Sequence, residues 1–379
     1  MSAKRSFAQP GRMEYEIDMH TTFWSAEQAR TGIQEAAAAL AAGGVVAFPT
    51  ETVYGLGGDA RSTEAVKRIF EAKGRPSDNP LIVHLADEAE VFELAERVND
   101  VEKALMAAFW PGPLTLVLPV KAGAVSSLVT AGLDTVAVRV PAHELARELI
   151  GRSGCPLAAP SANRSGRPSP TRASHVLEDL DGRIDGILDG GETGVGLEST
   201  VVRVLDGIVH ILRPGGVTKE QLQEAVGATA DIVSPENDAK VTTSSSEPDS
   251  DSEQAPRSPG TKYAHYAPRG EMIVFSGPQE MLVEAIQAKT DETAKLGRRI
   301  AVLCCSEHAG LYREAEAVFD CGERGNPEQA ARALYARLRE CDERGLDFIL
   351  AEGYPEEGIG AALMNRLRKA AGGREIVVR

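Results

Sequence analysis

The 379-residue chain has few of the features that mark secreted, membrane-bound or zinc-stabilised proteins. Its five cysteines are odd in number and show no C-x-x-C spacing, which argues against a disulfide framework and a zinc ribbon. No apolar run approaches the ~20 residues that a membrane span needs. The N-terminus carries two early cations but lacks the apolar core of a signal peptide. We therefore expect a cytoplasmic protein without a membrane segment, in which the cysteines are small buried side chains.

Basic residues are also scarce relative to acidic ones. The chain has 41 Lys and Arg against 56 Asp and Glu, which gives a formal net charge of −15. A chain this acidic does not attract nucleic acid through its overall charge, so any anion site must be a local concentration of Arg and Lys. A G-x-G-x-x-G fingerprint and a Ser–His–Asp arrangement are both missing. We therefore expect catalysis by positioning and charge neutralisation.

Short apolar runs alternate with amphipathic segments along most of the chain, which is typical of α/β proteins. Residues 27–230 predict a mixed, twisted open sheet with helices, because Asp206-Gly207 between two apolar runs signals a type I′ hairpin. Residues 270–379 repeat the alternation at the spacing of a smaller Rossmann-like α/β domain. Two domains also agree with a length of roughly 150 residues per domain.

Two further segments complete the predicted organisation. Residues 1–26 form an N-terminal extension, and residues 231–269 form a flexible acidic linker that is rich in Ser, Pro and acids. The linker ends in SPGTKYAHYAP, which contains Tyr263, Tyr266 and two prolines. That composition is poor for a spacer, since prolines lower the entropy lost on docking and tyrosines bury well. The motif therefore either packs against its own domain or closes over a ligand.

Two motifs of the first domain concentrate groups that are suited to anions. PTETVYGLG, at residues 49–57, follows a strand, where open α/β sheets place ligands. In KGRPSDNP, at residues 73–80, Lys73 and Arg75 flank a glycine at a predicted helix end. Lysine supplies a point charge and arginine a bidentate fork, a combination that suits a polyphosphate. Compensation of the helix dipole is the alternative interpretation of this pair.

Three more polar features lie at or beside predicted strands. Arg139 ends an apolar strand, and an arginine is rarely buried without an anionic partner, so we expect it to bind a carboxylate or a phosphate. His84 also ends a strand, where a hydrogen-bonded core histidine is the alternative. APSANRSG and GLEST, at residues 159–166 and 196–200, add small hydroxyl and amide donors.

In this order, PTETVYGLG, KGRPSDNPLIVH, TVAVRVP, APSANRSG, GLESTVV and LRPG resemble the YrdC-type threonylcarbamoyl-AMP synthase family. The resemblance covers roughly residues 32–226, and the linker motif and small domain resemble the two-domain members. It implies a nucleotidyltransferase that joins L-threonine, bicarbonate or CO₂, and ATP into threonylcarbamoyl-AMP and releases pyrophosphate. Downstream partner proteins would use the product to modify the adenosine beside the anticodon of tRNA.

The resemblance also implies a role for individual residues. It assigns Lys73 and Arg75 to catalysis. L-Threonine would be surrounded by Thr50, Thr52, His84, Arg139, Ala159 and Ser199. ATP would be bound by Lys73, Arg75, Asn79, Thr135, Ser161, Asn163, Ser169, Arg213, Tyr263 and Tyr266. Mg²⁺ is expected with the triphosphate, without a dedicated carboxylate cage or an organic cofactor, and the SPGTKYAHYAP motif would act as a lid.

Two alternatives stay open on the sequence. One is the carbamoyl-AMP-forming module of hydrogenase-maturation proteins, although those chains add an acylphosphatase-like part and C-x-x-C pairs that are missing here. The other is a non-catalytic RNA-binding protein that uses the basic residues near the predicted pocket to contact phosphates. Against it, the chain is acidic and no aromatic stacking platform lies among those cations. Direct binding of tRNA is not decided by the sequence.

Overall fold

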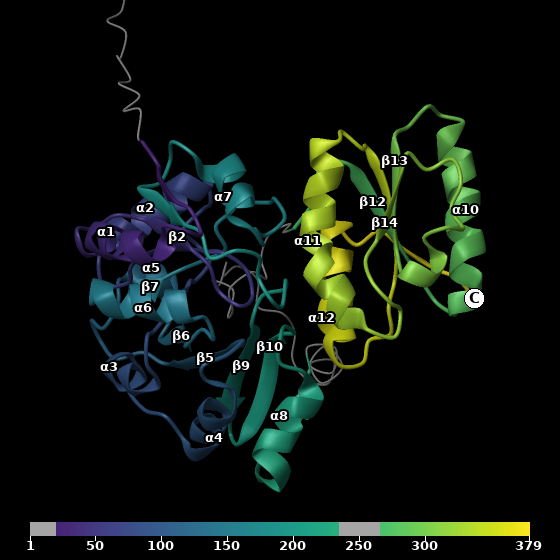
Figure 1. Cartoon of the computed structure of the whole chain (residues 1–379). Coiled ribbons are helices and arrows are strands. Elements are labelled where there is room, and N and C mark those ends of the chain that lie inside the picture. Colours follow the sequence, from purple (N-terminus) through teal and green to yellow (C-terminus); the bar gives the residue numbers. More distant parts are fainter. Residues whose placement is uncertain (1–19, 235–265) are drawn as a thin grey trace, which may run out of the picture.

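The computed structural model describes residues 20–234 and 266–379, which form two α/β domains side by side (Figure 1). The first domain contains an eleven-stranded sheet. Its strands, in spatial order, are β1 (Thr22–Trp24), β8 (Gly186–Leu188), β2 (Val46–Phe48), β3 (Gly55–Asp59), β7 (Leu157–Ala158), β4 (Ile82–His84), β6 (Thr135–Arg139), β5 (Leu114–Pro119), β9 (Thr200–Leu205), β10 (Ile208–Arg213) and β11 (Ile232–Val233).

The helices of the first domain cover this sheet and bury its apolar side chains. They are α1 (Ala29–Ala41), α2 (Thr63–Lys73), η1 (Glu88–Glu90), α3 (Val91–Leu94), α4 (Asp100–Phe109), α5 (Ser127–Thr130), α6 (Glu144–Ser153), α7 (Ala173–Leu180), α8 (Lys219–Val226) and η2 (Gly227–Thr229). The sheet is mixed, as predicted: β4 and β6 are parallel, whereas β5 and β6 are antiparallel. Asp206 and Gly207 both have positive φ, 51° and 79°, in the turn between β9 and β10, which fits the predicted hairpin.

The second domain is built on a five-stranded sheet in which every pairing is parallel. Its strands, in spatial order, are β14 (Ala317–Asp320), β13 (Ile300–Cys304), β15 (Phe348–Glu352), β12 (Glu271–Ser276) and β16 (Glu375–Val377). Its helices are α10 (Gln279–Ala294), η3 (Ser306–His308), α11 (Pro327–Glu343) and α12 (Ile359–Ala370). Helices α11 and α12 cover the face toward the first domain, and α10 covers the other face (Figure 1). The predicted Rossmann-like domain is confirmed.

The structure differs from the sequence-based prediction in three places. The sheet extends beyond the predicted bounds 27–230 of the first domain, because β1 pairs with β8 and β11 pairs with β10. The glycine-rich end of PTETVYGLG is a strand, β3, antiparallel to β2, and not a turn. Glycines are required there because a Cβ on Gly57 would lie 2.8 Å from the ring of Phe48.

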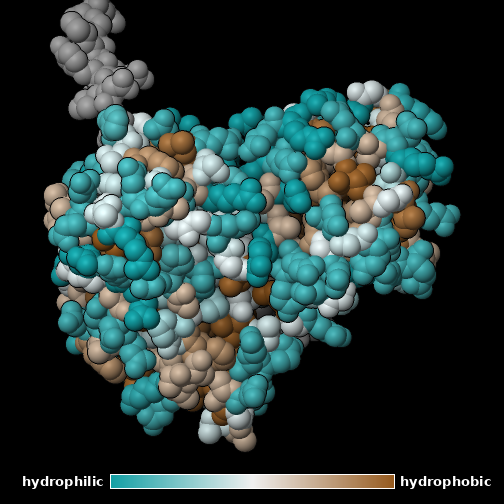
Figure 2. Space-filling model, in the orientation of Figure 1, coloured by the Kyte–Doolittle hydropathy of each residue, from teal (hydrophilic) through white to brown (hydrophobic). Residues whose placement is uncertain are grey.

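One face of the molecule is mostly polar, and the cysteines lie in the interior. The face drawn in Figure 2 is mostly hydrophilic, with apolar residues gathered near the junction of the two lobes. All five cysteines are buried and none forms a disulfide, as expected. Within the described residues, no helix is both long and apolar enough to cross a membrane.

Candidate active site

A cavity of about 80 Å³ lies in the first domain where strand ends and loops converge, and Tyr266 from the end of the linker closes part of it. Twelve residues predicted from the sequence line it: Thr50, Thr52, Lys73, Arg75, His84, Arg139, Ala159, Ser161, Asn163, Ser199, Arg213 and Tyr266. Asn79, Thr135 and Ser169 are buried but are not among the lining residues. Tyr263 lies outside the described residues.

Lys73 enters the cavity from the last turn of α2, a helix with clear sequence boundaries. Ser62 caps its N-terminus by accepting from the Ala65 amide, and Gly74 ends it with a left-handed φ of 60°. The Lys73 Nζ donates to the carbonyl oxygens of Ser161 and Asn163 at 2.5 and 2.6 Å. Burial and the neighbouring Arg75 hold the pKa of Lys73 well below its usual range. These contacts reach across to the 161–163 loop, so the ammonium does more than compensate the dipole of its own helix.

Arg139 lies at the end of β6 and is almost fully buried. Its Nη2 lies 2.5 Å from a carboxylate oxygen of Glu51, and its Nη1 donates to the Thr52 hydroxyl at 2.9 Å. Its Nε donates to the carbonyl of Gly112 at 3.1 Å. The sequence predicted an anionic partner for this arginine but did not identify Glu51. The structure thus provides that partner within the PTETVYGLG motif itself.

Thr50 and His84 have more local contacts. The Thr50 hydroxyl donates to the Val53 carbonyl at 2.6 Å and lies 2.8 Å from the Thr52 hydroxyl, so it closes the turn. The ring of His84 lies edge-on to Phe48, and its Nδ1 is 3.3 Å from the Ile82 carbonyl. Burial, with the charge of Arg139 nearby, lowers the pKa of His84 to about 3. His84 is therefore a neutral imidazole at physiological pH.

Ser199 directly precedes β9, and Arg213 is the last residue of the neighbouring strand β10. Arg213 donates to the Ser199 carbonyl from Nη2 at 2.9 Å and to the Ser199 hydroxyl at 3.2 Å. The same hydroxyl lies 2.8 Å from that of Thr115. Gly215 permits this approach, because a Cβ there would lie 2.3 Å from the Glu198 carbonyl oxygen. Ser199 and Arg213 therefore form one packed unit at the cavity wall.

Thr135 occupies the other end of β6 from Arg139. It pairs with Pro119 of β5, four residues before the arginine. Since a strand rises by roughly 3.3 Å per residue, the two side chains are separated by about 13 Å along the strand. Thr135 and Arg139 therefore cannot contact the same small group.

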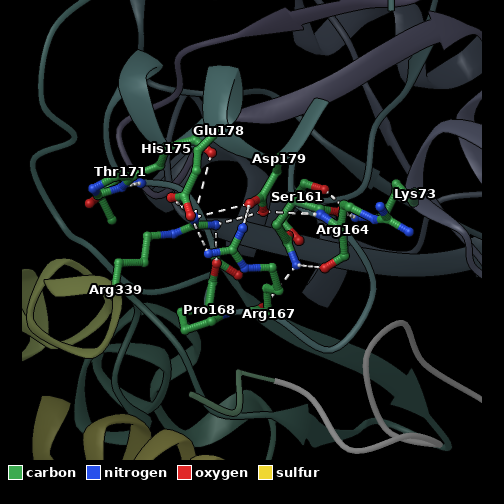
Figure 3. A network of polar contacts seen from close by, with 12 residues as sticks. Lys73, Ser161, Arg164, Arg167, Pro168, Thr171, His175, Glu178, Asp179 and Arg339 are labelled. Atoms are coloured by element: carbon green, nitrogen blue, oxygen red, sulfur yellow. Dashed lines mark hydrogen bonds and ion pairs between the residues drawn. The ribbon is translucent and has the colours of Figure 1, made fainter. Parts of the chain in front are cut away.

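A polar network joins the floor of the cavity to the second domain (Figure 3). The Asp179 carboxylate accepts from the Arg164 amide at 3.1 Å, from Arg167, and from Arg339 Nη2 at 2.9 Å. Arg339 comes from α11 of the second domain and also donates to the Pro168 carbonyl at 2.6 Å. The 161–163 loop, whose carbonyl oxygens accept from Lys73, is thus held in place by side chains of both domains.

Sequence reasoning missed the acids that hold the cations of the site. Glu51 lies within a quoted motif, and an acidic residue between two threonines after an apolar strand was the available signal. Glu198 lies within the quoted GLEST motif, but its partners in the second domain, Tyr335 and Arg366, are 137 and 168 residues away in the sequence. Asp179 and Arg339 are likewise 160 residues apart, so no local pattern indicated either pairing.

One group of potential metal ligands lies in the second domain of the described structure. Cys305, His308 and Glu352 place their ligand atoms within 4.8 Å of one another. The Glu352 carboxylate is already bound by His308 at 2.8 Å and by Tyr312, and Arg324 lies 3.7 Å away. An arginine beside a buried carboxylate opposes a second cation, so we interpret this group as a hydrogen-bonded core cluster.

Comparison with known proteins decides the family. The model described as "Telomere recombination" matches residues 38–215, and the model described as "Threonylcarbamoyl-AMP synthase, C-terminal domain" matches residues 217–372. A threonylcarbamoyl-AMP synthase from Bacillus subtilis is 52% identical over 344 residues, which cover 91% of this chain and 94% of the relative. The chain belongs to the threonylcarbamoyl-AMP synthase family. It is an enzyme with the activity of that family, as the sequence motifs predicted.

Two further members of the threonylcarbamoyl-AMP synthase family differ in how much of the chain they match. A structure of Sua5 from Pyrococcus abyssi, complexed with L-threonine, is 44% identical, covers 95% of this chain and 99% of its own, and has a TM-score of 0.83. A putative threonylcarbamoyl-AMP synthase from Mycobacterium tuberculosis is 37% identical over 204 residues, which cover 54% of this chain and 93% of the relative. The two-domain architecture is therefore shared with Sua5.

Proposed function

We propose that the cavity makes threonylcarbamoyl-AMP from L-threonine, bicarbonate and ATP, with separate walls for the amino acid and the nucleotide. One observation carries this proposal: the Lys73, Arg75 and Arg213 cations and the Arg139–Thr52–His84 group line the same enclosed space. The P. abyssi relative that binds L-threonine matches over nearly the full length of the chain, which supports the amino-acid half.

The threonine wall is small, buried and asymmetric in charge. The Arg139 guanidinium is the cation that suits an amino-acid carboxylate, and the Thr52 hydroxyl and the neutral His84 ring suit the substrate hydroxyl and methyl groups. We propose Thr50, the Ala159 backbone and Ser199 as the remaining contacts. Because Glu51 already lies on Arg139, the substrate carboxylate must share or displace that carboxylate on binding.

The nucleotide wall supplies most of the positive charge. Lys73 and Arg75 approach from the end of α2 and Arg213 from the end of β10, so the three cations can surround a triphosphate. The amine of threonine condenses with bicarbonate to form a carbamate and water. A carbamate oxygen then attacks the α-phosphorus, and the bond from that phosphorus to the β-phosphate breaks as pyrophosphate leaves. Lys73, Arg75 and Arg213 neutralise the departing charge. We also propose Asn79, Thr135, Ser161, Asn163, Ser169, Tyr263 and Tyr266 as ATP contacts.

Mg²⁺ is proposed to arrive with the triphosphate. Among the described residues that line the cavity, Glu198 is the carboxylate, and Arg366 lies 2.7 Å from it. Glu51, on the other wall, is bound by Arg139. Carboxylates held by arginines do not form a cation cage, so the ion would be bound by phosphate oxygens and water. We propose no organic cofactor.

The closed cavity is smaller than ATP. Ligand pockets commonly measure roughly 300–1,000 Å³, whereas this cavity encloses about 80 Å³. Tyr266 is buried and lines the wall. We propose that the linker motif SPGTKYAHYAP, which contains Tyr266, moves aside for ATP and then closes over it, so that water is excluded from the mixed anhydride.

A pyrophosphate-release assay tests the proposal directly. ATP, bicarbonate and each amino acid are supplied in turn, and the expected result is release that depends on L-threonine and on bicarbonate. Release that needs a carbamoyl donor such as carbamoyl phosphate, and neither an amino acid nor bicarbonate, would indicate carbamoyl-AMP chemistry. No release together with tight RNA binding would indicate a non-catalytic RNA-binding protein. We propose that the protein acts in the cytoplasm and that downstream tRNA-modifying proteins take up the product.

A further inference from the structure

The Glu198 carboxylate on the cavity wall forms an ion pair with Arg366 of the second domain. It is buried, and its neighbour along the chain is Ser199 of the proposed threonine wall. Ser169 of its own domain donates to it at 2.7 Å. From the second domain, the Tyr335 hydroxyl lies 3.0 Å from both of its oxygens, and Arg366 Nε donates to it at 2.7 Å.

Arg366 is fixed behind the wall of the cavity and does not face its space. The side chain is fully buried on α12, and its Nη1 donates to the Asn365 side chain at 2.7 Å. Its guanidinium carbon lies 5.4 Å from the ring centroid of Tyr266, which itself stacks on Tyr335 at 5.3 Å. At this wall, the second domain therefore touches the site through the Arg366–Glu198 ion pair and through Tyr335, on which Tyr266 of the linker stacks.

The charge on Glu198 is permanent at neutral pH. Burial alone would raise the pKa of this carboxyl, but Arg366 and Arg213, with the Ser169 hydrogen bond, lower it to about 2. A buried carboxylate without a close cation would have two effects here. It would draw Arg213 toward itself, and it would repel a triphosphate in the same cavity.

We infer that Arg366 is a positioning residue for ATP: by holding Glu198, the second domain leaves Arg213 directed at the cavity and removes a negative charge from the nucleotide site. The inference rests on the proposed function, because it assumes that Arg213 binds the phosphates. It gives the second domain an electrostatic part in nucleotide binding that is separate from closure of the linker.

The inference is tested in the full-length protein by removing the charge of Arg366 first and then also that of Glu198. Arg366→Met leaves Glu198 unpaired, and we expect the Kd for ATP to rise about tenfold or more while the Kd for L-threonine changes by less than about threefold. Adding Glu198→Gln removes the unpaired charge, so the double variant should recover ATP binding to within about threefold of the unmodified protein. Both constants are measured by calorimetry, with the melting temperature recorded for each variant.

The matched control is Arg368→Ala, on the same helix. Arg368 pairs with Glu356 and Glu375 away from the cavity, so ATP binding should not change. A folded Arg366→Met protein with normal ATP affinity would overturn the inference, as would a double variant that binds as weakly as the single one. A merely structural role predicts equal loss for ATP and threonine and no rescue.

A second variant covers the case in which Arg366→Met does not fold. Glu198→Gln alone keeps Arg366 and Tyr335 in place and removes the negative charge, so ATP should bind as tightly as before or more tightly. Weaker ATP binding by this variant would contradict the inference. Failure of the proposed function is recognised separately, because Arg213→Ala would then leave the Kd for ATP unchanged whatever Arg366 does.

Discussion

At the scale of single residues, the cations of the site are all held by specific acceptors. Lys73 donates to two backbone carbonyls, Arg139 lies on Glu51, and Arg213 donates to Ser199. Burying a charge without a partner is costly, and each of these partners lowers that cost while fixing one orientation of the side chain.

Arg139 gives the first prediction. Arg139→Ala removes the proposed carboxylate partner, and losing a charge-assisted pair costs ~1.5–3 kcal/mol, so the Kd for L-threonine should rise by about one to two decades. The Kd for ATP should change far less. Glu51→Gln serves as the matched variant, because it keeps Arg139 and frees it from a competing carboxylate. Unchanged threonine binding in a folded Arg139→Ala protein would exclude this assignment.

His84 predicts a dependence of stability on pH. Its pKa is about 3 in the folded protein and about 6.5 in the unfolded chain, so between these values the unfolded state binds more protons. The free energy of unfolding should therefore fall as the pH drops through 6.5 toward 3. His84→Gln should reduce this loss.

Urea unfolding at pH 7 and pH 5 measures the effect of His84. Glu198, with a folded pKa of about 2, and other carboxyls whose pKa is lowered titrate mainly below this window, so they contribute little to the difference. His175 has a similarly low pKa, about 3, because it is buried beside Arg339, so part of the acid sensitivity should remain. A His84→Gln protein that loses as much stability as the unmodified one between pH 7 and pH 5 would contradict the prediction.

At the scale of elements, the sequence predicted the helices and strands whose ends carry local signals. It missed strands whose residues are determined by contacts with distant parts of the chain. The Ser62 cap and Gly74 marked both ends of α2, and Asp206-Gly207 marked the hairpin between β9 and β10. Strand β3 was missed because its glycines lack the β-branched residues by which strands are recognised. Glycines are required in β3 because neighbouring side chains pack directly on its backbone, as the Phe48 ring does on Gly57.

The residues of the site also divide into those with a local sequence signal and those whose role depends on distant contacts. Lys73, Arg75 and Arg139 were found because each stood out against its predicted helix end or strand. Arg339 and Arg366 are two of the arginines on amphipathic helices, where a charged residue is normally solvent-exposed, so nothing in the local pattern indicated that both are fully buried. Their partners Asp179 and Glu198 lie in the other domain, and that pairing depends on how the domains dock.

The end of helix α2 gives the next prediction. If Lys73 binds the triphosphate, Lys73→Ala should lower the turnover number at saturating threonine by more than any loss of folded protein explains. If it only stabilises the helix end and the 161–163 loop, the melting temperature should fall while the turnover number per folded molecule stays the same. Lys67→Ala, on an exposed turn of the same helix and paired with Glu64, provides the control.

At the scale of the whole molecule, the second domain contributes side chains to the floor and wall of a site that lies in the first. Arg339 holds Asp179 beneath the loop that accepts Lys73, and Arg366 holds Glu198 beside Arg213 (Figure 3 shows the first of these networks). Apolar contacts also join the two domains, since Val53 and Leu197 of the first domain belong to the core cluster of the second. The M. tuberculosis relative matches only about half of this chain, so the two-domain design adds contacts to a module that others use in a shorter form.

Removing everything after Ser234 tests that design. The three core clusters that lie wholly in the first domain contain residues from Trp24 to Ile232 alone, so the truncated protein should fold, with some stability lost through exposure of Val53 and Leu197. It should bind ATP more weakly and should be inactive or release its intermediate to water, since Tyr266 and Arg366 are both gone. The measurements are the Kd for ATP, the rate of pyrophosphate release and the yield of threonylcarbamoyl-AMP.

Glu198→Gln in the truncated protein separates the loss of ATP affinity from the loss of product retention. It should restore part of the ATP affinity, because the unpaired charge is removed. It should not restore retention of the product, because the linker is still absent. A truncated protein that makes and retains threonylcarbamoyl-AMP at the full-length rate would show that neither the linker nor the second domain is needed for the chemistry.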